Sequence, residues 1–107
     1  MSCECNEWSA SAKRVSGPKP ARTVDVIGRC ICTRTGHKLK LAYGNPGINP
    51  DRKLVVLDLT IEEPEIGHDT MTPETVEFRG EIGLEPERVE VRMPSGKTVT
   101  IPIEDAS

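Results

Sequence analysis

The sequence predicts an all-β fold: a single antiparallel β-sandwich or small barrel of about six to seven strands. The 107 residues fit one domain. Of the 23 large aliphatic residues (nine Val, eight Ile, six Leu), 17 are β-branched, which favours pleated strands over helices. Apolar and polar residues alternate with a period of two between about residues 23 and 104, and clusters of turn-forming residues separate the runs.

Residues 1–22 are predicted to form a flexible basic tail that carries Cys3 and Cys5. The segment 9–22 is small, polar and basic and contains two prolines, so it offers too little apolar surface to offset the entropy lost on ordering. We therefore expect a disordered N-terminus, with the all-β domain over residues 23–107.

The first half of the domain predicts two strands joined by a tight turn. Gly36 can supply the positive φ that a hairpin turn requires. The return strand covers residues 38–43, where apolar and polar side chains alternate. Four side chains share one face of the first strand, with Gly28 interrupting the series: Val24, Val26, Cys30 and Cys32.

The second half predicts a strand over about 53–61, an acidic loop from Glu62 to Thr72, and two final strands over 89–93 and 99–103. Thr72-Pro73-Glu74 has the composition of a helix start, but the following residues alternate again, so at most one helical turn fits before a strand over 75–79. Pro102 has no N–H to donate, which predicts that the last strand lies at a sheet edge.

Charge is distributed unevenly along the chain. Residues 1–40 hold eight of the 14 Lys and Arg against three acids, a net charge of +5, and residues 41–107 have a net charge of −8. The favoured interpretation is that the two halves pair as neighbouring strands and neutralise each other. Tyr43 is the only aromatic residue in or beside the basic part of the predicted domain, so specific nucleic-acid binding, which uses stacking platforms, is not expected.

The four cysteines form two Cys-x-Cys pairs, and three states remain open for them. A bridge within a pair is not expected, because Cα atoms two residues apart on a strand are roughly 6.5–7 Å apart, at or beyond the limit for a disulfide. In the favoured state Cys30 and Cys32 are apolar core residues and Cys3 and Cys5 are free thiols; the alternatives are disulfides between the pairs and a zinc site. The zinc site would draw on Cys3, Cys5, Cys30, Cys32 and His37.

The sequence gives little support for a catalytic function. His68 lies among carboxylates in the acidic loop, where it could take part in acid–base chemistry, but a solvated loop is the simpler interpretation. The serines lie in the predicted tail, one turn and the terminus, and glycine motifs for phosphates or dinucleotides are missing. The sequence therefore leans against an enzyme and designates no catalytic residues.

The leading functional hypothesis is a non-catalytic module that binds a protein partner or assembles through an edge strand. The second is a small thiolate metal protein with zinc as its cofactor, and the third is an enzyme that uses His68. The N-terminus shows no apolar signal segment and no run is long enough to span a bilayer, so we expect a cytoplasmic protein without membrane contact.

Overall fold

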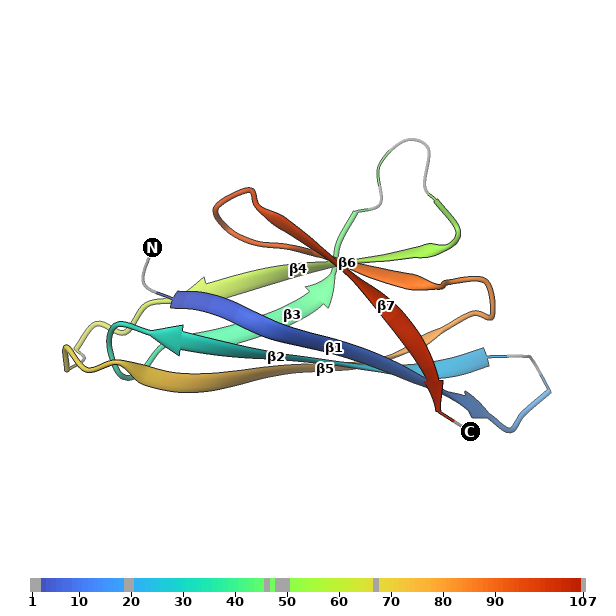
Figure 1. Cartoon of the computed structure of the whole chain (residues 1–107), viewed down its shortest axis with the longest axis horizontal. Helices are drawn as coiled ribbons and strands as arrows, with labels where there is room; N and C mark the ends of the chain where they lie inside the picture. The colour runs from blue at the N-terminus through green and yellow to red at the C-terminus, as the bar shows by residue number, and fades with distance from the viewer. Residues whose placement is uncertain (1–2, 19–20, 46, 48–50, 67, 107) are drawn as a thin grey trace.

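The computed structural model describes residues 3–18, 21–45, 47, 51–66 and 68–106, and these form seven strands (Figure 1). None of the described residues is helical, and they contain no helix of the length and hydrophobicity that a membrane crossing requires. The strands are β1 (Cys3–Val15), β2 (Ala21–Cys32), β3 (Lys38–Tyr43), β4 (Leu54–Glu62), β5 (Thr72–Ile82), β6 (Arg88–Arg92) and β7 (Thr98–Ala106).

All seven strands belong to one sheet, in the order β3-β4-β6-β7-β1-β2-β5. The edge strands β3 and β5 approach each other, so the sheet curls into a nearly closed barrel and the all-β prediction is confirmed. Four neighbouring pairs are antiparallel, whereas β1–β7 and β4–β6 are parallel, so the sheet is mixed rather than purely antiparallel. The strand β5 begins at Thr72, where the sequence allowed a helical turn.

The core lies inside the barrel and is built from the alternation that the sequence predicted. Every second side chain of β2, β4 and β6 faces inward, while the intervening ones face solvent or are partly covered. β1 contributes the small side chains Ala10 and Ala12, which suit the narrow interior of a small barrel. Five aliphatic side chains are completely buried: Val24, Val26, Leu57, Val89 and Val91.

The prediction of a flexible tail over residues 1–22 is corrected by β1. This strand pairs antiparallel with β2 from Cys3 opposite Cys32 to Val15 opposite Ala21. Apolar burial alone would not offset the entropy that this segment loses on ordering. Main-chain hydrogen bonds to β2 and two disulfides to β2 supply further stabilisation, which the composition of the segment does not reveal. Residues 1–2 and 19–20 of the predicted tail lie outside the described residues.

A bulge in β1 turns Trp8 into the barrel. Glu7 has a positive φ of 55°, and the register with β2 shifts between Asn6 and Ser9. The indole ring of Trp8 packs against the core and lies so close to Gly28 that a Cβ at position 28 would overlap it. The glycine that interrupts the apolar face of β2 therefore provides the space for this ring.

β7 is an interior strand, so the prediction that Pro102 marks a sheet edge is wrong. Residues 98–102 pair with β6, and residues 103–106 pair with β1. The amide of Ile103 donates to the carbonyl of Glu87, 2.8 Å away. Because the N–H groups of successive residues in a strand point to opposite sides, the nitrogen of Pro102 points away from β6. The pairing with β1 begins only at the next residue, and the missing N–H therefore costs no ladder bond.

Side chains complete the barrel where main-chain pairing stops. The hydroxyl of Tyr43 on β3 donates to the carbonyl oxygen of Glu81 on β5 at 2.7 Å, and its ring packs edge-on against Phe78 with 5.0 Å between centroids. A Cβ at position 80 would overlap the Tyr43 hydroxyl, so Gly80 makes this approach possible.

Three ion pairs among the described residues join the first part of the chain to the second. Two of them pair a base of the first part, Arg22 or Arg34, with an acid of the second, whereas in Asp25–Arg79 the charges are reversed. Arg22 is buried and binds Asp105 of β7 at 2.7 Å, while its Nε donates to the carbonyl of Gly83 at 3.2 Å. The other two pairs are Arg34–Asp69 at 3.2 Å and Asp25–Arg79 at 2.7 Å.

Candidate functional site

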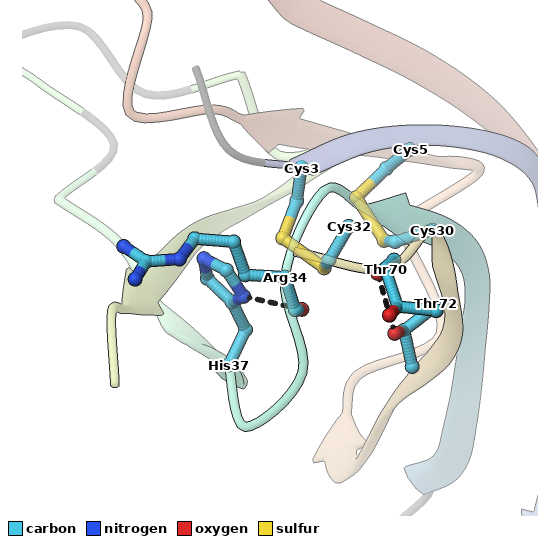
Figure 2. Close-up of a disulfide and its surroundings, with 8 residues drawn as sticks. All are labelled: Cys3, Cys5, Cys30, Cys32, Arg34, His37, Thr70 and Thr72. Carbon is cyan, nitrogen blue, oxygen red and sulfur yellow. Dashed lines mark hydrogen bonds between the residues drawn. A yellow bond between two sulfur atoms is a disulfide. The ribbon is translucent and has the colours of Figure 1, made fainter. Parts of the chain in front are cut away.

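Two disulfides connect β1 to β2 near the start of the chain, Cys3–Cys32 and Cys5–Cys30 (Figure 2). Cys30 and Cys32 are buried in the core, as predicted, but none of the described cysteines is free. The prediction of free thiols is therefore wrong, and bridges form between the two pairs. The reason is the register of β1, which places each N-terminal cysteine directly opposite its partner on β2. No bridge forms within a Cys-x-Cys pair, as the strand geometry predicted.

His37 lies beside the Cys3–Cys32 disulfide, in the segment between β2 and β3. Only 6% of its surface is exposed. Its Nδ1 is 3.0 Å from the carbonyl oxygen of Arg34, and because a carbonyl only accepts, Nδ1 carries the proton. Nε2 then has a free lone pair, and it is buried without a hydrogen-bond partner among the described residues.

The structure gathers three of the five predicted metal ligands. One ligand atom each from Cys3, Cys32 and His37 lies within 4.8 Å of the other two, and all three residues are buried. Cys5 and Cys30 form the neighbouring disulfide and do not belong to this cluster. The cluster contains the soft sulfur and imidazole donors that zinc prefers, although its sulfurs are joined in the structure.

The main chain of β1 has no neighbouring strand on its second side near these disulfides, in the part of the chain that the structure describes. The Cα atoms of the bridged pairs are 4.0 and 3.9 Å apart, which marks them as the closely spaced pairs of an antiparallel ladder that exchange no hydrogen bonds. The N–H and C=O groups of Cys3 and Cys5 therefore point away from β2. β7 pairs with β1 only from Ala10 to Lys13, so within the described ranges Cys3 and Cys5 have no strand partner on that side.

A groove of about 250 Å³ lies along this open part of β1. We call it the seam; Figure 1 shows β7 separating from β1 there, so that the β6–β7 hairpin extends away. β1 forms one wall of the seam, and the turn after β6 forms the other. The residues that line it are Cys3, Glu4, Cys5, Leu59, Ile61, Met93, Pro94, Ser95 and Lys97.

His68 lies on an exposed loop rather than in a site. Its described contacts are made by the backbone: its amide donates to the Thr35 hydroxyl, and its carbonyl accepts from the Thr35 amide, each at 3.0 Å. The carboxylates of Glu62, Glu63 and Glu65 are on exposed residues as well. The structure thus gives the acid–base hypothesis no converging groups among the described residues, and Gly67 lies outside them.

Sequence reasoning identified the cysteines and His37 but missed the seam. The inward alternation of β4 did indicate Leu59 and Ile61 as apolar. No local pattern, however, predicts that β1 and β7 run side by side for only four residue pairs. No protein-family model, curated protein or solved structure matches this chain.

Proposed function

We propose that this protein is a non-catalytic binding module that takes up an extended segment of a protein partner in the seam. The observation that supports this function is the pair of unmatched main-chain positions at Cys3 and Cys5, beside an apolar groove. An extended segment added to a sheet edge gains affinity from main-chain hydrogen bonds and specificity from pockets for alternate side chains.

The spacing of the open positions suits a β-strand. Cys3 and Cys5 are two residues apart, and alternate residues of an added strand would meet their N–H and C=O groups. The disulfides hold these positions against β2, so the edge is ordered before a partner arrives and binding costs less entropy.

The side chains of the seam define the partner segment that fits. Ile61 and Met93, which are partly exposed, offer apolar surface above the buried Leu59, while Glu4 and Lys97 carry opposite charges. A segment with apolar residues at alternate positions and little net charge matches this lining.

The disulfides also suggest in which cellular compartment the protein acts. Disulfides persist in oxidising compartments, whereas thiols in the cytosol are kept reduced. We propose that the bridged form acts outside the reducing cytosol; the cytoplasmic location expected from the sequence would require the reduced form of the chain.

Selection from a phage-displayed library of short random peptides tests the function. The best synthetic peptide should slow amide exchange at Cys3 and Cys5 and shift the resonances of residues 93–97. Ser95→Trp places a large ring in the groove and should weaken binding roughly tenfold or more, which corresponds to about 1.4 kcal/mol. Ser16→Trp is the matched control, because Ser16 is exposed and outside the groove lining.

Two outcomes would contradict the proposal. In one, selected peptides protect the edges of β3 or β5 and leave Cys3 and Cys5 unchanged. In the other, Ser95→Trp and Ser16→Trp bind the peptide equally well.

A further inference from the structure

The buried cluster of Cys3, Cys32 and His37 lies beside the seam, and strand addition uses only the main chain of Cys3 and leaves the chemistry of these side chains unexplained. Sulfur and imidazole donors converge within 4.8 Å, and the imidazole is more than nine-tenths buried. A buried ring nitrogen without a hydrogen-bond partner among the described residues carries an uncompensated desolvation cost. A ligand that accepts its lone pair would remove that cost.

We propose that the Cys3–Cys32 disulfide and His37 form a redox-controlled zinc site. In the reduced protein the thiolates of Cys3 and Cys32 and a ring nitrogen of His37 hold one Zn²⁺. A small-molecule disulfide oxidises the two thiolates: it accepts two electrons and leaves as two thiolates, the Cys3–Cys32 bond forms, and the ion is released.

The distances require only local movement. Zn–S bonds of about 2.3 Å and Zn–N bonds of about 2.0 Å in a tetrahedron place ligand atoms roughly 3.3–3.8 Å apart. The three donors are already within 4.8 Å of one another, and the two sulfurs, bonded at 2.03 Å, must separate. Side-chain rotation at Cys3 and Cys32 supplies this separation while β1 and β2 stay paired.

The hydrogen bond of His37 is the kind that accompanies metal-bound histidines. Such a residue usually donates its other ring N–H to a carbonyl or carboxylate, which fixes the tautomer and the ring orientation. His37 has this arrangement, with Nδ1 at 3.0 Å from the Arg34 carbonyl oxygen (Figure 2). This hydrogen bond assigns the Nδ1 proton and leaves Nε2 as the ring nitrogen that can bind a cation.

The reaction balances with a thiol reductant. Two small-molecule thiols give two electrons and two protons to the Cys3–Cys32 bond and become one disulfide, which leaves two cysteine thiols. Zn²⁺ then displaces two protons as the two Zn–S bonds form. We assign the fourth position to a water molecule, which would enter from the seam because Cys3 is one of its lining residues.

Titration with Zn²⁺ and Co²⁺, before and after reduction by a phosphine, tests the site. The reduced chain should bind one ion and give the visible absorption of tetrahedral thiolate cobalt, whereas the oxidised chain should bind none. His37→Asn retains a hydrogen-bond donor near the Arg34 carbonyl but removes the zinc ligand, and should weaken binding by roughly 10–100-fold or more. His68→Asn is the matched control, since His68 is exposed, and should bind like the unchanged chain.

A second variant separates the site from the neighbouring disulfide. Cys5→Ala with Cys30→Ala should retain zinc binding in the reduced state, and circular dichroism should report retained strand structure. Zinc binding that is unchanged by His37→Asn, lost in the Cys5/Cys30 variant, or equal in the oxidised and reduced chains would overturn the proposal. None of these results depends on peptide binding in the seam.

Discussion

At the scale of single residues, the Trp8 ring leaves no space for a side chain at position 28. The backbone of β2 leaves room for the Trp8 ring only because Gly28 has no side chain. Gly28→Ala should lower the free energy of unfolding by about 1–3 kcal/mol, the usual cost of overpacking a core. Urea unfolding followed by the fluorescence of Trp8, the single tryptophan of the chain, measures this change directly.

Gly83→Ala is the control for this substitution, because a Cβ at position 83 meets no atom within 4 Å. Equal stability of the Gly28 and Gly83 variants would mean that Trp8 does not occupy the barrel. The sequence indicated an interruption at Gly28 but not its cause. The inward turn of Trp8 depends on the bulge at Glu7, and positive φ at a glutamate has no sequence signature.

At the scale of elements, Tyr43 joins the two edge strands. Burial, and then the charge of Glu81, raise the pKa of its phenol above 10.0. The folded state thus favours the protonated phenol, so the stability it contributes is complete below about pH 10 and is lost as the pH rises through the raised pKa. Because Tyr43 is the only tyrosine, its ultraviolet titration should show a midpoint above 10.0 in the folded protein and a lower midpoint in urea.

Tyr43→Phe removes the hydrogen bond to the Glu81 carbonyl while keeping the ring against Phe78. It should lower the free energy of unfolding at neutral pH by about 0.5 kcal/mol, the low end for a hydrogen bond, because the side chain is more than half exposed. An ordinary titration midpoint in the folded protein would argue that β3 and β5 are not joined there.

Some strands could be predicted from the sequence and others could not. Aliphatic alternation located β3 at its observed bounds and β2, β4 and β6 to within a few residues, because each strand buries one face. β1 was missed because Ala and Ser dominate its centre, and its stability comes from partners far along the chain. For the same reason the cysteines were recognised as candidates, while their pairing, which depends on β1, was not.

At the scale of the whole molecule, the barrel consists of two half-sheets that meet where β7 passes from β6 to β1. Among the described residues four pairs join β1 to β7, and the buried Arg22 reinforces this junction by binding the exposed Asp105 carboxylate and the Gly83 carbonyl. Arg22→Leu removes the hydrogen bonds that the buried guanidinium makes to Asp105 and to the Gly83 carbonyl and should destabilise the protein by about 1–3 kcal/mol. Amide exchange should accelerate at Ile103 more than at Val91, and equal acceleration at both would contradict this role.

The pairing of Ala10 with Ile103 also has a consequence for synthesis of the chain. During translation Ala10 leaves the ribosome long before its parallel partner, Ile103, has been synthesised. The first strand available to pair with β1 is therefore β2. Contacts between such distant residues slow folding, because a large loop must close before they form. The nascent chain should therefore assemble its covalently linked β1–β2 pair early and complete its barrel only after β7 has been translated.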